Sequence, residues 1–249
     1  MVPGAGTVLN VTTILLGSGI GVLLGHRLPE RTRATVTDAL GLVTLVIGGL
    51  SVVDGVGSPA LADAVGADAI LLIVLGALLV GGIVGSLLRV EDRLAASGGL
   101  LQRRLTRGGA GPERERFVEG YVTASLVFCI GPLAILGPLS DGLGEGIDQL
   151  ALKSALDGFA SLAFAASLGW GVAASAVSVG VVQGLLTVAG ALLGGLLPDA
   201  LVDVTTATGG VLLLGVGLRL LAVKAVPVGD LLPALLAAPV IATVVQALR

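Results

Sequence analysis

The chain has 249 residues, of which 55% are hydrophobic and only 12% are charged, and its formal net charge is −3. Its mean hydropathy of +1.04 lies far above the range of water-soluble domains and excludes a soluble globular fold. Cys129 is the single cysteine, which excludes an intrachain disulfide and any metal site built from several cysteines.

Apolar runs of about 20 residues recur along the chain, and each is long enough to cross roughly 30 Å of hydrocarbon as a helix. The runs are continuous rather than alternating, which favours helices over a barrel, and helices pair their own backbone groups in lipid. We therefore predict an all-α, polytopic transmembrane bundle of about eight spans that forms one membrane domain over residues 1–249. The predicted spans are 6–25, 35–53, 69–88, 117–139, 153–171, 176–197, 206–223 and 230–248. For residues 150–197 the sequence leaves open two spans or one span plus a re-entrant piece.

Basic residues are concentrated after the first, third and seventh predicted spans. All but Lys153 and Arg249 of the 14 basic residues lie there, and short loops rich in Lys and Arg remain cytoplasmic. Residues 89–116 then form the one substantial cytoplasmic loop, and we explain its arginines by topology rather than by recognition of nucleic acid or lipid. We therefore predict a multi-pass protein of the inner membrane with both termini outside.

Parts of the sequence resemble one another, although low-complexity apolar sequence also aligns with itself by chance. The aligned pairs are 7–24 with 180–197, 36–50 with 204–218, and 119–131 with 157–169. At the scale of whole elements, 6–53 repeats in 176–223 and 117–139 repeats in 153–171. Partner spans are separated by an odd number of crossings, so they cross the membrane in opposite directions. This inverted-topology repeat is typical of secondary transporters.

Two acidic residues at aligned positions are the strongest functional signal. Glu119 and Asp157 lie near the start of apolar helices, where a carboxylate is costly unless it faces a partner, a cavity or the interface. We expect the two acids to be buried in one shared polar pocket that binds a solute or an ion. In the alternative interpretation both acids lie at the membrane surface, with Arg116 within reach of Glu119 and Lys153 within reach of Asp157.

Both acidic segments contain residues that interrupt helices. Gly131 and Pro132 follow Glu119, and proline removes a backbone donor and clashes with the preceding turn. Gly169 and Gly171 follow Asp157 at the matching distance and loosen the helix there. Interrupted helices at corresponding positions of two repeats indicate a transport site.

Neutral polar residues supply further candidate ligands. Asn10 and Gln183 occupy aligned positions in the first and sixth spans, where a side-chain amide either binds a ligand or bonds a neighbouring helix. Thr123, Ser125 and Ser161 place hydroxyl oxygens on the two acidic helices. We include all five residues in the predicted binding site.

The glycine spacing indicates close helix packing, and the sequence contains no recognisable catalytic pattern. Gly17, Gly21 and Gly25 recur every four residues, which is typical of closely packed membrane helices. His26 is the only histidine and lies beside Arg27, and no serine lies in a hydrolase-like pattern. We therefore expect neither enzyme activity nor a cofactor or bound metal.

Four segments, which together run over nearly the whole chain, carry a family resemblance. They are EGYVTASLVFCIGPLAILG (119–137), KSALDGFASLAFAASLGWGV (153–172), VVQGLL (181–186) and GTVLN (6–10). They resemble the domain-of-unknown-function 554 family of bacterial membrane proteins, although Pro132 stands where a small residue is expected. The resemblance implies a bacterial inner-membrane protein with a link to biofilm formation, and it implies no particular substrate.

From these observations we expect a secondary transporter of a small solute or monovalent cation, coupled to protons or sodium. Two alternatives remain open: an ion channel or pore, and a non-transporting scaffold or biogenesis protein that works through the arginine-rich loop. The expected partners are the lipid bilayer and the transported solute or cation, without nucleic acid, and a homo-oligomer is left open.

Overall fold

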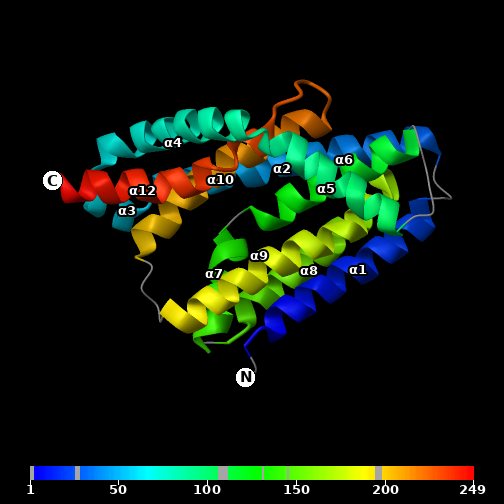
Figure 1. Ribbon diagram of the computed structural model, residues 1–249, viewed down its shortest axis with the longest axis horizontal. Helices are drawn as coiled ribbons and strands as arrows, with labels where there is room; N and C mark the ends of the chain where they lie inside the picture. Colours follow the sequence, from blue (N-terminus) through cyan, green and yellow to red (C-terminus); the bar gives the residue numbers. More distant parts are fainter. Residues whose placement is uncertain (1–2, 26–28, 106–111, 131, 145, 194–197) are drawn as a thin grey trace. The chain divides into compact units, whose positions relative to one another are not determined.

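The computed structural model describes residues 3–25, 29–105, 112–130, 132–144, 146–193 and 198–249. These residues form helices and turns without any strand, which confirms the predicted all-α class. Figure 1 shows the helices in chain order, and their contacts divide them into two compact units. The single membrane domain expected from the sequence stays a prediction.

Unit 1 comprises Met1–Leu40, Arg93–Cys129 and Leu133–Gly195. It begins with α1 (Ala5–Gly25), the first part of α2 (Glu30–Val56) and most of α5 (Val90–Leu105). It continues with α6 (Pro112–Cys129), α7 (Pro132–Leu143), α8 (Asp148–Leu168) and α9 (Gly171–Leu193).

Unit 2 comprises Gly41–Asp92, Ile130–Pro132 and Leu196–Arg249. It contains the larger part of α2 with α3 (Pro59–Val65), α4 (Ala67–Leu88), α10 (Asp199–Leu220), α11 (Val228–Leu231) and α12 (Ala234–Ala247).

Six helical segments in the described part of the chain are long and apolar enough to cross a membrane. They are α1, α2, α4, α9, α10 and the combined α11–α12 segment Val228–Ala247. The α6–α7 pair, which is bent by 94°, makes a seventh if the pair counts as one span. The expected number of eight is therefore not confirmed. The missing one is α8, the expected fifth span, which carries Asp148, Lys153 and Asp157.

Two helices occur where the sequence suggested loops. Most of the segment predicted as the cytoplasmic loop is helical, because α5 begins at Val90 with Glu91 and Asp92 in its first turn, where acidic side chains suit the helix dipole. The short α3 begins at Pro59, and Ser58 before it is the N-cap, whose hydroxyl accepts the N–H of Leu61.

Backbone contact holds α1 against α8 in unit 1. Gly17 lies against Gly158, and Gly25 lies against Ala166 eight residues further along both helices, so the two helices run parallel. A Cβ added at Gly17, Gly21 or Gly25 would overlap a carbonyl oxygen of α8. The four-residue glycine spacing therefore serves close helix packing, as the sequence suggested.

Similar contacts organise unit 2. Gly81 and Gly85 of α4 lie against the backbones of Ala234 and Asp230, so α4 runs antiparallel to the α11–α12 segment. Side chains of α3, α4, α10 and α12 form a common apolar core around Ala77. Small residues at these contacts allow the helices to approach closely, as is common within membranes.

Candidate functional site

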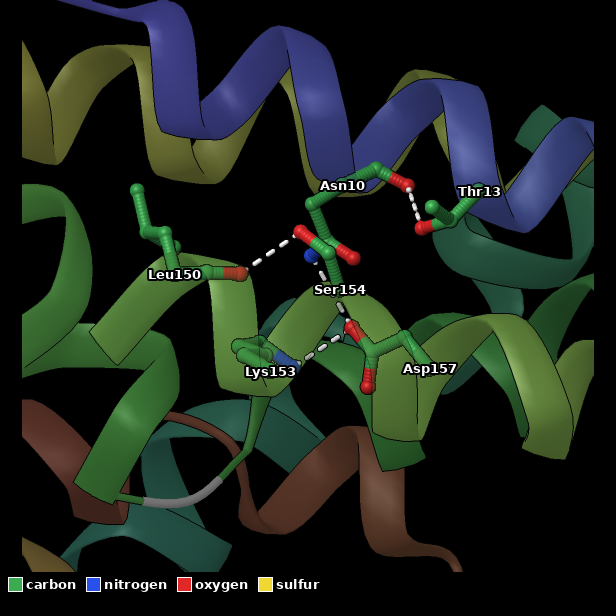
Figure 2. Close-up of polar contacts among 6 residues, drawn as sticks. All are labelled: Asn10, Thr13, Leu150, Lys153, Ser154 and Asp157. Carbon is green, nitrogen blue, oxygen red and sulfur yellow. Dashed lines mark hydrogen bonds and ion pairs between the residues drawn. The ribbon is translucent and has the colours of Figure 1, made fainter. Parts of the chain in front are cut away.

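A buried ion pair lies between α1 and α8 in unit 1 (Figure 2). Lys153 Nζ lies 2.6 Å from Asp157 Oδ2, and the two residues are four apart on α8. Asn10 Nδ2 of α1 donates a hydrogen bond of 2.9 Å to the same carboxylate oxygen. The three side chains therefore form one connected group, which we call the Asp157 cluster.

Burial makes the Asp157 cluster energetically unusual. Asn10 is fully buried, and Lys153 and Asp157 expose only 5% and 7% of their surface. Removing two charges from water costs several kcal/mol per ion, and their attraction offsets this cost only when the geometry is good. The close approach of Lys153 and the extra donor from Asn10 supply that geometry.

The hydroxyl groups around the cluster use their protons elsewhere. Thr13 Oγ1 donates to the carbonyl oxygen of Asn10 at 2.9 Å, and Ser154 Oγ donates to that of Leu150 at 2.6 Å (Figure 2). Ser161, one turn beyond Asp157, donates to its own helix in the same way. These bonds leave oxygen lone pairs, rather than protons, available near the cluster.

Three buried polar atoms near the α1–α9 contact have no hydrogen-bond partner among the described residues. They are Asn10 Oδ1 and both amide atoms of Gln183, which is 1% exposed. Leaving such a group unsatisfied costs about 1–3 kcal/mol, so each atom requires an explanation. Gln183 belongs to α9, which touches α1 where the hydroxyl oxygens of Thr7 and Thr187 lie 3.4 Å apart.

Glu119 does not belong to the Asp157 cluster. Its side chain lies exposed on α6, whereas Asp157 is buried. The expectation of two buried acids in one pocket is therefore wrong for Glu119. The physical reason is the helix face: the adjacent Gly120 packs against Leu168, which turns Glu119 away from the interior of the unit. Arg116, the suggested surface partner of Glu119, donates instead to the carbonyl oxygen of Ser167 at 2.9 and 2.5 Å.

The predicted hydroxyl ligands on α6 lie in a different group. Ser125 Oγ lies 3.0 Å from Ser178 Oγ of α9, and Ser178 donates to the Tyr121 hydroxyl at 2.8 Å. Ser97 of α5 lies 3.3 Å from the same hydroxyl. Thr123 is buried on α6. This chain of hydroxyls joins three helices, and Ser125 lies one turn before Cys129.

Helix ends occur at the two positions where the sequence suggested interruptions. On one side α6 ends at Cys129 and α7 begins at Pro132, while Gly131 lies outside the described residues. On the other side α8 ends before Gly169, whose φ of +78° favours glycine, and α9 begins at Gly171. Residues 150–197 thus contain two helices, α8 and α9, of which α9 is among the six candidate membrane helices and α8 is not.

Two contributors to this region were not recognised as such from the sequence. Lys153 was considered only as a surface partner, although its four-residue spacing from Asp157 already matched a helical ion pair. Asp141 of α7 is 2% exposed, and its carboxylate accepts the N–H groups of Gly4 and Gly6 at 3.1 Å each. The Asp141 carboxylate therefore anchors the start of α1. No local sequence signal identifies this long-range contact.

Comparison with known proteins agrees with the resemblance noted from the motifs. A family model described as "Protein of unknown function (DUF554)" matches residues 5–243. The chain is 34% identical over 233 residues to "Uncharacterized protein YqgA" of Escherichia coli (strain K12), covering 94% of each chain. It is 29% identical over 242 residues to "Uncharacterized membrane protein YdfK" of Bacillus subtilis (strain 168), covering 97% of each. No solved structure matches significantly. The chain belongs to the DUF554 family.

Proposed function

We propose that the protein is a secondary transporter of a small solute or monovalent cation, and that the Asp157 cluster is its coupling site. The observation that carries the proposal is a buried Lys153–Asp157 ion pair joined by an amide whose other atom is unpartnered. Ionisable residues inside membrane proteins are rare, and they mark ion pathways, proton relays or substrate sites.

A purely structural role explains the cluster less well. Replacing a buried ion pair by apolar residues of similar volume is often neutral or stabilising, so stability alone gives little reason for Lys153 and Asp157. The packing of α1 on α8 already rests on backbone contact through Gly17 and Gly21. A function in which the charge of this site changes therefore explains Lys153 and Asp157 better than a contribution to stability does.

The helix arrangement supports a two-fold, inverted-repeat design. Three helices lie beside their aligned partners within the same unit: α1 beside α9, α6 beside α8, and α2 beside α10. The α2–α10 pair is antiparallel, because Gly48 lies against Gly210 while Gly55 lies against Asp203. Partners that run in opposite directions are expected when two repeats are related by a pseudo-two-fold axis in the membrane plane.

Interrupted helices provide the second structural element of such a transporter. Asp157 is carried by α8. Along the chain, the 94° bend between α6 and α7 precedes this helix, and the turn between α8 and α9 follows it. Irregular backbone at membrane depth is tolerated where it is buried in protein or lines a cavity. We place the protein in the inner membrane with both termini outside, from the distribution of its basic residues.

The test is flux in reconstituted vesicles that contain the dye pyranine. A panel of alkali cations, ammonium and small neutral solutes is added outside, and internal pH is recorded. The wild type should give a saturable response to at least one member of the panel. The double variant Lys153→Met/Asp157→Asn, which removes both charges together and keeps an acceptor for Asn10, should give none. Glu119→Gln is the matched control, because its carboxylate is exposed, and it should respond like the wild type.

Two results would overturn the proposal. One is a full response from the double variant after it has been shown to fold. The other is no protein-dependent response to any member of the panel. Unitary currents in planar bilayers would instead indicate a channel, because a carrier moves too few charges per second to produce them.

A further inference from the structure

An apolar groove lies on unit 1 where α1, α6 and α9 meet. Its volume is about 690 Å³, which is within the range of ligand-binding pockets. The lining comes from Val11 and Leu15 of α1, from Phe117 of α6, and from small apolar residues of α9. Leu15 and Val181 in this lining are 48% and 57% exposed, so the groove is open at the surface of the described structure.

The groove extends along α9 for about half the thickness of a membrane. Trp170 lies at one end, just before the start of α9, and Gly180 and Val181 lie at the other. From Gly171 to Val181 a helix rises about 15 Å, whereas the hydrocarbon core of a bilayer is about 30 Å thick. Because α1 and α9 are both long and apolar enough to cross a membrane, we expect the groove to face the acyl chains of one leaflet.

A basic residue lies at the Trp170 end of the groove. Arg116 directly precedes Phe117, and its guanidinium donates to the carbonyl oxygen of Ser167 beside Gly169. Trp170 itself is 53% exposed, and tryptophan is enriched where membrane and water meet. In the orientation proposed from the basic residues, this end faces the cytoplasm. Basic pockets between membrane helices on that side bind anionic lipid head groups.

The acidic residues of α6 do not cancel this positive charge. Glu113, Glu115 and Glu119 are exposed, so water and salt screen them, whereas Arg116 is half-buried and is screened less. The groove therefore combines an apolar length with a positively charged end, which matches the two parts of an anionic phospholipid.

We propose that the groove binds one acyl chain of an anionic phospholipid, whose phosphate lies at Arg116. A flexible chain fills the space between the small residues of α9, where an unfilled groove would lose van der Waals contacts. The phosphate oxygens accept charge-assisted hydrogen bonds from the guanidinium. This inference goes beyond the proposed transport function and does not depend on it.

Trp170 provides a direct test, because it lines the groove and is the single tryptophan. Purified full-length protein in detergent is titrated with phosphatidylglycerol whose acyl chains carry bromine, which quenches indole fluorescence at close range. We expect saturable quenching that unbrominated phosphatidylglycerol reverses. Phosphatidylcholine with the same brominated chains has no net charge, and it should require about five times the concentration for half-maximal quenching.

Gly180→Leu tests the groove by filling its inner end. A Cβ on Gly180 would lie 3.4 Å from Val11 Cγ2, an ordinary contact, so the backbone accepts a side chain there. The concentration of phosphatidylglycerol for half-maximal quenching should rise about tenfold or more. Gly184→Leu is the matched control, because Gly184 faces open space one turn further along α9 and does not line the groove. Ala173→Leu fills the outer part and replaces Gly180→Leu if that variant does not fold.

Arg116→Gln tests the head-group contact. It removes the positive charge, so both lipids should quench Trp170 at the same concentration. Arg114→Gln is the matched control, because the Arg114 guanidinium lies against Gly99 of α5, and it should keep the preference for phosphatidylglycerol.

The proposal is overturned if quenching rises with brominated lipid without saturation, or if folded groove-filling variants bind lipid like the wild type. A preference for phosphatidylglycerol that survives in Arg116→Gln would overturn the assigned head-group contact. A stable dimer that Gly180→Leu separates, without lipid-dependent quenching, would assign the groove to a second copy of the chain instead. None of these measurements involves flux, so a failure here is distinguishable from failure of the transport function.

Discussion

The Lys153–Asp157 pair allows a quantitative test of how the buried charges balance. At the 2.6 Å separation of Nζ and Oδ2, an effective dielectric constant of about 20 gives an attraction of about 6 kcal/mol. Their side chains are only 7% and 9% exposed, so solvent screens this attraction little. Desolvation of the two ions costs several kcal/mol each, so the attraction and the desolvation cost nearly cancel.

Single and double substitutions should therefore behave differently. Lys153→Met alone or Asp157→Asn alone leaves one buried charge without its partner, and each should lower the free energy of unfolding by about 3–5 kcal/mol. The double variant Lys153→Met/Asp157→Asn removes both charges, and the new amide oxygen can still accept from Asn10. It should lie within about 1 kcal/mol of the wild type.

The measurement is unfolding in mixed micelles with increasing SDS, followed by far-UV circular dichroism and by the fluorescence of Trp170, the single tryptophan. The reasoning is refuted if both single variants are as stable as the wild type. It is also refuted if the double variant loses the sum of the single effects, because the two charges would then act independently.

Three further substitutions, two of them with a matched control, test the packing and polar contacts of unit 1 by the same unfolding assay. Gly21→Ala places a Cβ onto a carbonyl oxygen of α8 and should cost about 2 kcal/mol or more, whereas Gly19→Ala faces open space and should be neutral or slightly stabilising; equal effects would contradict the backbone contact. Asp141→Asn weakens the anchor at the start of α1 and should cost about 1–2 kcal/mol, while the exposed Asp148→Asn should cost less; the reverse order would argue against the anchor. Tyr121→Phe removes the hydroxyl that joins α9 to α6 and should cost about 1 kcal/mol; no loss would mean that the bond is replaced elsewhere.

The sequence predicts the all-helical class and most of the membrane helices because apolar length alone determines them. It also singles out Asn10 and Asp157, since isolated polar residues in apolar runs require partners, and the two side chains are hydrogen-bonded to each other. Helix ends near Pro132 and Gly169 follow from local backbone chemistry. These features depend on residues that lie close together in the chain.

Features that depend on which face a helix buries were not predictable in the same way. Glu119 and Asp157 have similar neighbours in sequence, yet tertiary packing exposes one and buries the other. The contact of Asp141 with Gly4 and Gly6 spans more than 130 residues and has no local signature. The role of Lys153 depends on its side chain turning inward along α8, because the same spacing at a surface would give an ordinary exposed pair.

The close approach of α1 and α8 also determines how unit 1 can move. At Gly17, Gly21 and Gly25, carbonyl oxygens of α8 occupy the places where side chains of α1 would lie, so at these three positions no side chain of α1 can rearrange. We therefore expect α1 and α8 to move as one rigid pair, with the Asp157 cluster intact between them. In the proposed transport cycle, opening toward either side of the bilayer would then come from the turns next to this pair, between α6 and α7 and at Gly169.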